Sequence, residues 1–489
     1  MRSWLLFIKI AFSKLKAEMF KRRIAGLKRL SVFPIPQLSP ESAATLQKIF
    51  QTSGFTSSSN GDSSDENPAL TTLKRLFVQA EAVPVILVAR VLSPLKLDEL
   101  IHSGLLHQDG DLVQSLLQAQ SHQGLIFFSD FRYHEHAEEY VLPVGPAGKY
   151  LVSLTLRKPV HSTLDLGCGC GLQSLLAARH SERVTATDIN PRALAVTRLN
   201  ADLNGMSNIE VLEGSFFEPV EGRKFDLILA NLPYVISPEN NLIYRDNAGD
   251  AYLHQLIRDM PAYLVEDGFA QILSNWIYGK DEPWWEPLER TLEDLGMDAW
   301  LLHNGTRTPE GYADMWLDTR LKNNKRKYAR MKNAWVKWYH DQGIEQIALG
   351  DIILRRRTTG QNWVCSANVT KSLLESPAGE QLARLFETQD FLAILPDNET
   401  LLETVLIPVD MEVQSGEDER SLQAVTTRGF NFQAALSPLT AEVIRGLDGR
   451  TRLSEAIQKA GQGVDDDPTF LLDIQTLLGL GMLAPRSAR

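Results

Sequence analysis

The chain has 489 residues, of which 44% are hydrophobic, so it is too long for one ordinary domain and can bury a core in each of several units. A formal net charge of −11 excludes a surface that is basic all over, so nucleic acid could be bound only through a local basic patch. Three cysteines are too few for a disulfide framework, and no apolar run approaches the roughly 18 to 20 residues of a membrane span. We therefore expect a multidomain globular protein of the cytoplasm.

The first 30 residues are basic, with Glu18 as their single acid and the spacing of an amphipathic helix. A solvated extension is the favoured interpretation, and contact with a membrane surface is the alternative. The run is not a typical signal peptide, because Lys9 interrupts it and no small-residue cleavage site follows. Residues 52–67 are polar and small, so 1–66 are predicted to be a basic extension and a disordered linker.

A compact N-terminal module is predicted over 67–135. Helical patterns over 70–82, 97–106 and 112–118 precede a strand over 124–129. Three short helices that end in a strand are typical of a winged-helix-like module. Such modules bind DNA in some proteins and other proteins elsewhere, so the shape alone indicates no function.

Residues 136–360 alternate short β-rich runs with helical patterns. The alternation predicts the α/β class, with a doubly wound, mostly parallel, seven-stranded Rossmann-like sheet. The predicted strands cover 162–166, 183–187, 209–212, 225–230, 270–275, 299–303 and 346–355. A helical insertion over 308–345 precedes the last strand, which is expected to be an antiparallel edge.

The C-terminal module is predicted over 361–489. Three helical patterns fall within 436–485, with a Gly-Leu-Asp-Gly turn at 446–449. This part is predicted to be a second small winged-helix-like module.

A glycine-rich stretch, Leu-Asp-Leu-Gly-Cys-Gly-Cys-Gly, joins a β-rich run to a helical one. Gly167, Gly169 and Gly171 place bare backbone at a helix N-terminus, where a nucleotide cofactor can approach without meeting a Cβ atom. A dinucleotide fingerprint needs its third glycine one position later, where this chain has Leu172. Asp188 ends the next predicted strand, and its carboxylate can accept hydrogen bonds from ribose hydroxyls.

No metal site is predicted. Cys168 and Cys170 have neither the spacing nor the number of ligands of a structural zinc site. His134 and His136 flank a single Glu, a pattern more typical of a solvated turn.

Asn231, Leu232, Pro233 and Tyr234 follow the β-rich run 225–230. A planar amide or exocyclic amine is a poor nucleophile, because its lone pair is delocalised and must be localised and aimed before it can attack. The side-chain carbonyl of Asn231 and the main-chain carbonyl of Leu232 can accept its N–H hydrogens, while Tyr234 offers a ring to stack on it. The four residues are the predicted catalytic group, with an ordinary strand-to-turn Asn-x-Pro as the alternative.

With these motifs, residues 140–356 resemble a class I S-adenosylmethionine-dependent methyltransferase of the small methyltransferase group. The resemblance implies S-adenosyl-L-methionine as cofactor, Asp165 near its methionine amino group and 213–216 against its adenine. Many members have Asp where this chain has Ser215. The implied cofactor-binding residues are Asp165, Gly167, Cys168, Gly169, Gly171, Asp188, Ile189, Ser215, Phe216 and Asn231.

The group Asn231 to Tyr234 resembles the Asn-Pro-Pro-Tyr motif of amino-group methyltransferases, with Leu232 in place of the first proline. Release-factor glutamine methyltransferases also share Asp-Ile-Asn-Pro at 188–191 and Phe-Phe-Glu-Pro at 216–219. They carry an Ile-Pro-Arg-Pro-Glu-Thr-like stretch where this chain has Leu-Pro-Val-Gly-Pro-Ala. Ribosomal-RNA guanine methyltransferases share the same catalytic core.

A further likeness is to long, uncharacterised bacterial proteins, which share Ile-Ser-Pro at 236–238, Gly-Asp at 249–250 and Asn-Trp at 275–276. They also share Tyr244, Arg245 and Asp246, which are placed where a loop could recognise the acceptor. A surface turn is the equally weighted alternative.

Residues 320–339 concentrate cations and aromatic residues in one helical pattern, as phosphate contact with base stacking would need. They include Lys322, Lys325, Arg326, Lys327, Tyr328, Arg330, Lys332, Trp335, Lys337 and Trp338. A packed aromatic face with a solvated cationic face is the favoured alternative to nucleic-acid contact.

The sequence therefore predicts an S-adenosylmethionine-dependent N-methyltransferase (EC 2.1.1.-) that modifies a planar amide or exocyclic amine. A protein glutamine, as in a release factor, is slightly favoured as the acceptor over a base of rRNA or tRNA. The second alternative is a non-catalytic cofactor-binding scaffold whose terminal modules recruit partners. Leu232 and Ser215 motivate this alternative, because both depart from the family pattern.

Overall fold

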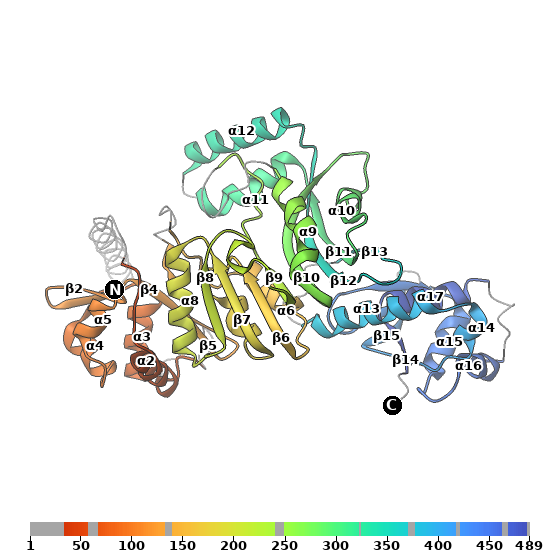
Figure 1. Ribbon diagram of the computed structural model, residues 1–489, viewed down its shortest axis with the longest axis horizontal. Coiled ribbons are helices and arrows are strands. Elements are labelled where there is room, and N and C mark those ends of the chain that lie inside the picture. Colours follow the sequence, from red (N-terminus) through yellow and green to blue (C-terminus); the bar gives the residue numbers. More distant parts are fainter. Residues whose placement is uncertain are drawn as a thin grey trace, which may run out of the picture. The chain divides into compact units, whose positions relative to one another are not determined.

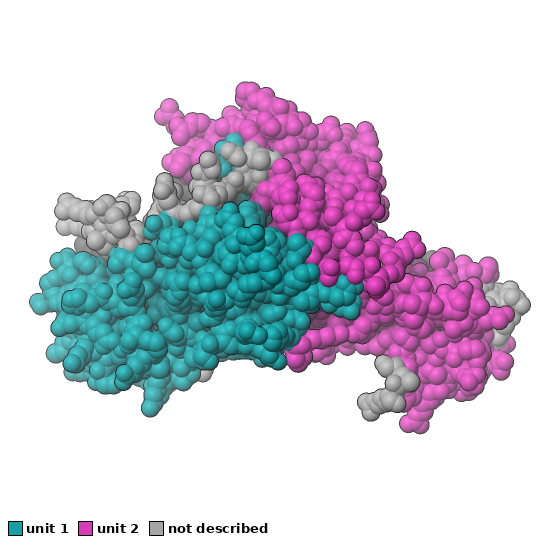
Figure 2. Space-filling view, viewed as in Figure 1, with its two compact units in different colours: residues 1–148, 160–247, 262–268 teal, residues 149–159, 248–261, 269–489 magenta. Residues whose placement is uncertain are grey.

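A computed structural model describes residues 34–56, 67–132, 139–239, 249–321, 324–369, 377–416, 421–461 and 468–486. The chain divides into two compact units, coloured separately in Figure 2. Unit 1 comprises residues 1–148, 160–247 and 262–268, and unit 2 comprises 149–159, 248–261 and 269–489. Every described helix is too short or too polar to cross a lipid bilayer. The basic extension and most of the predicted linker lie outside the described residues.

The described part of unit 1 includes, near its start, a helix that the sequence did not predict. α2 (Pro40–Ser53) starts at the N-cap Ser39 and buries Leu46 and Phe50. Ser53 and Phe55 are also buried, although both lie where the sequence predicted linker. The three apolar side chains are four or five positions apart, which places them on one side of the chain as it leaves the helix.

The N-terminal part of unit 1 continues as short helices and strands (Figure 1). They are α3 (Pro68–Phe77), β1 (Val83–Pro84), α4 (Val85–Val91), α5 (Leu97–His102), β2 (Leu106–Asp109), β3 (Leu112–Ser115), β4 (Leu117–His122) and β5 (Leu125–Asp130). Strands β1, β3 and β2 form one antiparallel sheet in that order, and β4 pairs with β5. The winged-helix assignment of this module stays a prediction.

The helix predicted over 112–118 is wrong, because these residues form β3 and β4. Asp109 pairs with Leu112 across a two-residue turn, in which Gly110 has a φ of +59°. A Gly-Asp turn between apolar runs is a hairpin signal, since glycine supplies the positive φ that the first turn position needs, and it outweighs the helical spacing of the leucines that follow.

The central sheet has eight strands, one more than predicted. Four of them lie in unit 1, where the order β9-β6-β7-β8 is parallel throughout. They are β6 (Val160–Leu166), β7 (Ser181–Asp188), β8 (Ile209–Glu213) and β9 (Phe225–Ala230). The sheet is mostly parallel and the fold is α/β and Rossmann-like, as predicted.

Helices connect these strands, as parallel pairing requires. They are α7 (Leu172–Ala177), α8 (Pro191–Leu203) and the 3₁₀ helix η2 (Glu218–Val220), while α6 (Pro146–Leu154) precedes β6. α8 begins at the N-cap Asn190 with Pro191 in its first turn. It packs against β7 and β8 and also against β5 of the N-terminal module.

The other sheet strands, largely in unit 2, have the order β13-β11-β12-β10. They are β10 (Leu264–Tyr278), β11 (Met297–Arg307), β12 (Gln346–Arg356) and β13 (Val364–Asn368). β12 is antiparallel to both β10 and β11, so its antiparallel direction was predicted correctly and its position at the edge was not. The edge is β13, which the sequence analysis missed and which pairs parallel with β11. The near-continuous burial of β12 fits an interior strand that is covered on both faces.

Unit 2 is completed by helices around the sheet and by the C-terminal module. The helices up to residue 394 are α9 (Ala251–Tyr263), α10 (Glu286–Leu292), α11 (Pro309–Leu321), α12 (Lys325–Asp341) and α13 (Gly379–Ile394). The module then contains α14 (Asn398–Leu402), β14 (Leu406–Pro408), β15 (Met411–Ser415), β16 (Leu422–Thr426), β17 (Gln433–Leu436), α15 (Pro438–Gly446), α16 (Leu453–Lys459), α17 (Phe470–Gly479) and β18 (Leu483–Pro485). α15, α16 and α17 fall where the three C-terminal helical patterns were read, and the winged-helix assignment of this end also stays a prediction.

Candidate active site

The glycine-rich loop and the Asn231 motif follow neighbouring parallel strands of unit 1. β6 pairs with β9, and the last pair in their register is Leu166 with Ala230. Gly167 and Asn231 are the next residues of the two chains, so both segments leave the sheet at the same carboxyl edge. Ligands of open parallel sheets bind at this edge.

The three glycines of the loop all have backbone conformations that side-chain-bearing residues rarely adopt. The φ angles are +70° at Gly167, +55° at Gly169 and +78° at Gly171. Gly167 N and Cys168 N both donate to Thr187 O at 2.9 Å, which ties the loop to the end of β7. A Cβ atom on Gly169 would meet nothing within 4 Å, so the backbone there is open to a ligand.

Asp165 is buried at the end of β6, where α7 holds it. Ser174 N donates to Asp165 Oδ2 at 2.9 Å, and the Ser174 hydroxyl donates to the same oxygen. Burial raises the pKa of Asp165 to about 6, against the lowering effect of these two bonds.

Asp188 lies at the end of β7 and is oriented by two backbone groups. Gly169 N donates to Asp188 Oδ2 at 3.0 Å and Asn190 N donates to Asp188 Oδ1 at 2.9 Å. Burial raises the pKa of this carboxyl, while these backbone bonds act in the opposite direction. Each carboxylate oxygen keeps a further lone pair, so the side chain can still accept hydrogen bonds from a diol.

The two loop cysteines are buried structural groups. Cys168 packs against Ala186 and Leu194, and Thr197 Oγ1 lies 3.4 Å from its sulfur. Burial raises the pKa of the Cys168 thiol well above its usual range and that of Cys170 to about 12. Among the described residues no group of three or more His, Cys, Asp or Glu side chains could hold a metal ion, and the predicted turn at His134 and His136 lies outside them.

Ile189 and Phe216 are large apolar side chains that remain 38% and 40% exposed. Ile189 directly follows Asp188, and Phe216 follows the end of β8 with a φ of +47°. Ser215 is held beside Phe216, because Ser215 N donates to Glu218 Oε2 at 3.3 Å and Glu218 N donates to Ser215 O at 3.0 Å. Exposed apolar groups beside an oriented carboxylate are suited to an aromatic base and its sugar.

Leu232 brings the motif after β9 into contact with the glycine loop. A Cβ atom on Gly167 would lie 2.6 Å from Leu232 Cδ2, so the leucine packs directly on the bare backbone of the loop. Asn231, Pro233 and Tyr234 are all half-buried beside it. The two predicted motifs therefore form one site within unit 1.

The structure also brings in Gly148, which the sequence analysis missed. A Cβ atom there would lie 2.8 Å from Leu172 Cδ2 and 3.8 Å from Asn231 Nδ2, and Gln173 Nε2 donates to Gly148 O at 3.2 Å. The start of α6 thus closes over the loop and the motif. The Gly-Pro-Ala-Gly run at 145–148 was the available signal.

The predicted recognition loop with Tyr244, Arg245 and Asp246 lies outside the described residues. Asp250, which follows it in unit 2, accepts a 2.7 Å hydrogen bond from Ile277 N. This bond fixes the start of α9 to the end of β10.

The four aromatic residues of α12 are buried or half-buried within unit 2. Trp335 and Tyr339 are buried, and Tyr312 packs edge-on against Tyr339. The hydroxyl of the half-buried Tyr328 donates to Asp314, which raises the pKa of Tyr328 to about 12.

The cations of α12 fall into two groups. Lys332 pairs with Asp314 at 2.6 Å and Lys337 pairs with Asp341 at 2.6 Å. A second group near the N-terminus of the helix forms no ion pair with any carboxylate that the structure describes. Its members are exposed, except for Lys327, which is half-buried. These are Lys325, Arg326, Lys327 and Arg330.

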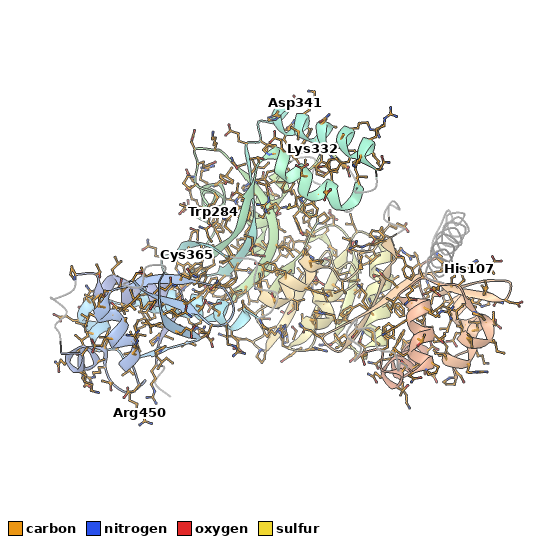
Figure 3. All side chains as sticks on the ribbon, turned by 180° about the vertical axis from the view of Figure 1, so that it is seen from behind. His107, Trp284, Lys332, Asp341, Cys365 and Arg450 are labelled. Atoms are coloured by element: carbon orange, nitrogen blue, oxygen red, sulfur yellow. The ribbon has the colours of Figure 1, made fainter. Side chains whose placement is uncertain are left out.

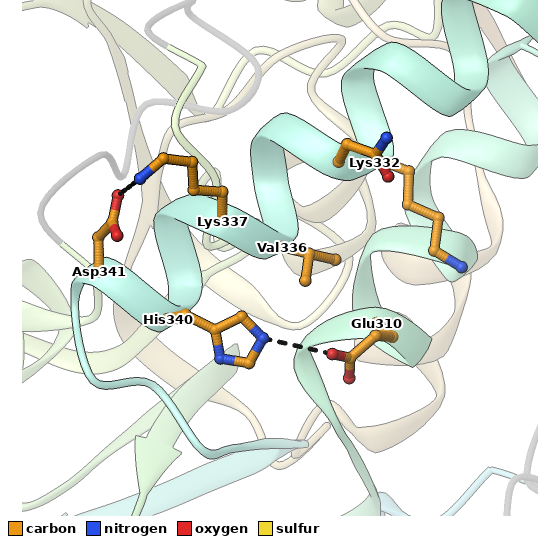
Figure 4. A pocket seen from close by; sticks show the side chains of 7 residues that line it. Glu310, Lys332, Val336, Lys337, His340 and Asp341 are labelled. Carbon is orange, nitrogen blue, oxygen red and sulfur yellow. Dashed lines mark hydrogen bonds and ion pairs between the residues drawn. The ribbon is translucent and has the colours of Figure 1, made fainter.

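An open pocket of about 450 Å³ lies between α11 and α12 (Figure 4). Its lining mixes both charges, with His340 Nε2 at 3.4 Å from Glu310 Oε1 and Lys337 directed at Asp341. Lys332 and Asp341 are labelled on this helix in Figure 3. The pocket contains none of the predicted catalytic or cofactor-binding residues.

The comparisons with known proteins converge on the segment that holds the site. Residues 144–290 match the methyltransferase small domain family. Residues 144–290 are a class I small methyltransferase domain. This places the domain among S-adenosylmethionine-dependent methyltransferases, as the sequence predicted. Residues 57–116 match a domain of unknown function, DUF7059.

Two curated relatives show how far the likeness of the methyltransferase domain extends. The release factor glutamine methyltransferase of Aquifex aeolicus is 39% identical over 107 residues, which are 20% of this chain and 37% of the relative. That of Enterococcus faecalis is 31% identical over 177 residues, 32% of this chain and 63% of the relative. The chain spans 37% to 64% of the length of the curated relatives it matches first.

Among solved structures, Trm5b from Pyrococcus abyssi matches with a TM-score of 0.30 and 17% identity, over 51% of this chain and 62% of that one. At this score the match adds nothing to the argument.

Proposed function

We propose that the protein is an S-adenosylmethionine-dependent N-methyltransferase whose acceptor is a planar nitrogen, with a protein glutamine amide favoured. The contact between Leu232 and Gly167 carries the proposal, because it joins the cofactor loop and the acceptor motif in one site. Without this contact between the two motifs, the glycine loop alone would support only a cofactor-binding scaffold.

The residues present fit S-adenosylmethionine. The open backbone at Gly169 leaves room for the cofactor, Asp188 is oriented to accept from its ribose, and Ile189 and Phe216 offer apolar cover for its adenine. When bound, the cofactor supplies an electrophilic methyl group on a sulfonium. The carboxylate of Asp165, which Ser174 holds at the start of α7, would bind the amino group of the cofactor's methionine part.

Asn231 and Leu232 would prepare the acceptor. The side-chain carbonyl of Asn231 and the main-chain carbonyl of Leu232 each accept one N–H of the flat nitrogen, which localises its lone pair. Tyr234 supports the plane of the acceptor from one side. Asn231 and Leu232 would hold the flat nitrogen toward the methyl group that the bound cofactor would supply, and one N–H proton of the acceptor would pass to solvent, so no strong base would be needed.

The favoured acceptor class rests on the named relatives. Release factor glutamine methyltransferases match 20% and 32% of this chain at 39% and 31% identity. The stretch 142–147 departs from their pattern, which leaves an exocyclic amine of an RNA base as the second candidate. The exposed cations of α12 favour that candidate, because they offer phosphate contacts in a chain of net charge −11.

Asn231→Ala removes one of the two acceptor groups and should lower methyl transfer by at least about a hundred-fold. Binding of S-adenosylmethionine should be nearly unchanged, because the loop backbone and Asp188 are untouched. The measurement is transfer of labelled methyl from S-adenosylmethionine to fractionated cell extract, beside a calorimetric titration with the cofactor. Full transfer by the variant would exclude a role for Asn231 in holding the acceptor.

The same assay separates the three functions under consideration. Label in protein supports the glutamine acceptor and label in RNA supports the second candidate. Cofactor uptake without label in either fraction supports the non-catalytic scaffold.

A further inference from the structure

Asn200, in the last turn of α8, uses its whole side-chain amide to bond two different segments of unit 1. Phe128 N donates to Asn200 Oδ1 at 2.7 Å, and Asn200 Nδ2 donates to Phe128 O at 2.9 Å and to Cys170 O at 2.8 Å. The side chain is fully buried. A main-chain N–H can only donate and a carbonyl can only accept, so the partners fix which amide atom faces which segment.

One of these segments belongs to the core of the N-terminal module. The Phe128 ring packs against Phe77 at 5.6 Å and Phe50 at 6.1 Å between centroids, so β5 cannot shift without disturbing that core. The other segment is the middle of the glycine loop. Asn200 is therefore a direct bridge between the module and the cofactor site.

The bond to Cys170 O is one of several that hold the loop from α8. Thr197, one turn earlier, donates to Gly169 O at 3.0 Å. Because a peptide group is planar, fixing two successive carbonyls also fixes the two N–H groups that follow them. The loop shape then depends on the position of α8 and on what holds α8.

Asn204 is an internal comparison for Asn200. It makes the same two-way bond one turn later, with Ile126 N at 3.0 Å to its Oδ1 and its Nδ2 at 2.7 Å from Ile126 O. Its second Nδ2 bond goes to Asn200 O and not to the loop. Both residues therefore attach α8 to β5, which lie side by side in Figure 1, and only Asn200 also holds the loop.

We infer that the N-terminal module is a positioning element for the cofactor loop and that it acts through Asn200. Asn200 is a positioning residue, since it bonds the backbone of the loop and not the cofactor. The inference rests on the proposed function in that it takes the glycine loop as the S-adenosylmethionine site. Coupling of this kind is reciprocal, so the cofactor also steadies β5, and a partner that shifts β5 changes the affinity for the cofactor.

The test compares Asn200→Ala with Asn204→Ala. Each variant removes two hydrogen bonds to β5, so both should lose similar thermal stability. Titration with S-adenosylmethionine should show roughly ten-fold weaker binding for Asn200→Ala and little change for Asn204→Ala. Equal affinities in the two variants, whether both normal or both weak, would overturn the inference.

Hydrogen exchange of the protein without cofactor gives a readout that does not depend on the proposed function. Peptides that contain 167–171 should exchange faster in Asn200→Ala and at the wild-type rate in Asn204→Ala. Asn200→Asp is a second variant, which keeps the acceptor for Phe128 N and replaces the two donor bonds with a carboxyl oxygen that faces the carbonyls of Phe128 and Cys170. Loop exchange at the wild-type rate in Asn200→Asp would overturn the inference, even if the wild-type protein binds no cofactor and the proposed function fails.

Discussion

At the scale of single residues, Gly167 is the point where the cofactor loop and the acceptor motif meet. Gly205 has nearly the same backbone conformation, with a φ of +67° against +70°, but a Cβ atom there would meet nothing within 4 Å. A comparison of alanine substitutions at the two glycines therefore separates the effect of backbone strain from the effect of contact with Leu232.

Gly167→Ala should cost about 1 to 3 kcal/mol more stability than Gly205→Ala, because its new methyl group collides with Leu232. It should also lower methyl transfer by displacing the acceptor motif, while Gly205→Ala keeps full activity. Denaturant unfolding and the transfer assay measure the two effects. Recovery of activity in Gly167→Ala combined with Leu232→Ala would identify the collision as the cause, and no recovery would contradict it.

Asp351 of β12 is a buried carboxyl group whose ionisation works against folding. Tyr150 Oη and Asn304 Nδ2 donate to its Oδ2 at 2.8 and 2.9 Å, and no described residue bonds its Oδ1. Burial raises its pKa to about 7. The native state therefore holds this proton between about pH 4 and pH 7, where the unfolded chain releases it.

The stability that this group contributes is present below about pH 4 and is lost as the pH rises through about 7. Asp351→Asn stays neutral, so its free energy of unfolding should fall less between pH 5 and pH 8 than that of the wild type. Urea unfolding at the two pH values measures the difference. Asp448→Asn is the control, because hydrogen bonds lower the pKa of Asp448 to about 2 and its charge is constant in this range. Equal pH slopes in wild type and Asp351→Asn would contradict the assignment.

The residues expected at the site could be read from the sequence because they lie in short motifs with local spacing. Gly148, Thr197 and Asn200 could not, since each acts on a segment that is distant in the chain. An asparagine inside a helix is ordinarily only a weak helix former, and nothing local shows that its amide will be matched to two backbones. The catalytic and cofactor-binding roles of all the residues expected at the site, Ser215 and Leu232 included, stay predictions.

At the scale of elements, α12 carries two groups of cations. One group is ion-paired, and the other has no ion pair with a carboxylate among the described residues. The free group lies in its first turns, where the helix dipole disfavours positive charge. Residues that cost local stability and lack a partner are candidates for binding an anion from outside. Trp335 and Tyr339 of α12 are buried, so the exposed cations would contact nucleic acid through its phosphates.

Arg326→Gln with Arg330→Gln should weaken binding of the protein to structured RNA and lower the slope of log K against log salt concentration by about two. Lys332→Gln with Lys337→Gln removes the same charge from ion-paired positions and should leave that slope nearly unchanged. Filter binding at several salt concentrations gives both slopes. An identical loss of RNA affinity in the two double variants would show that binding depends only on the net charge of the protein.

The strands that alternate with helices were predictable, because their apolar runs and spacing are local. β12 was misplaced for a different reason, since chain order does not tell where a late strand inserts. β13 is short and only half-buried or exposed, so its sequence carries little pattern. The helix α2 was missed because the polar run that follows it dominated the composition of that region.

At the scale of the whole molecule, the N-terminal module is fastened to the methyltransferase domain through a buried ion pair. Arg192 of α8 bonds Asp130 of β5 through Nη2 at 2.6 Å and Nε at 3.0 Å, and its Nη1 donates to Pro34 O at 2.7 Å. Asp130 Oδ2 also accepts from Val141 N at 2.9 Å. Both charged side chains are almost fully buried, at 3% and 2% exposure.

Asp130→Asn leaves the guanidinium of Arg192 buried without its counter-charge and should lower the free energy of unfolding by about 3 to 5 kcal/mol. Glu210→Gln removes the partner of Arg223 in a half-exposed pair of unit 1 and should cost less than about 1 kcal/mol. Thermal and denaturant unfolding measure both variants. A loss of the same small size in each would show that the buried pair does not fasten the module.

The placement of β11 has a consequence for biosynthesis. Its two neighbours in the sheet, β12 and β13, are both later in the chain, and the helices α11 and α12 come before either. While the ribosome is still translating 308–345, the apolar strand β11 has no mate on either edge. Until residue 356 has been synthesised, β11 therefore remains exposed to pairing with other polypeptides. Chaperone binding during this interval would prevent such pairing.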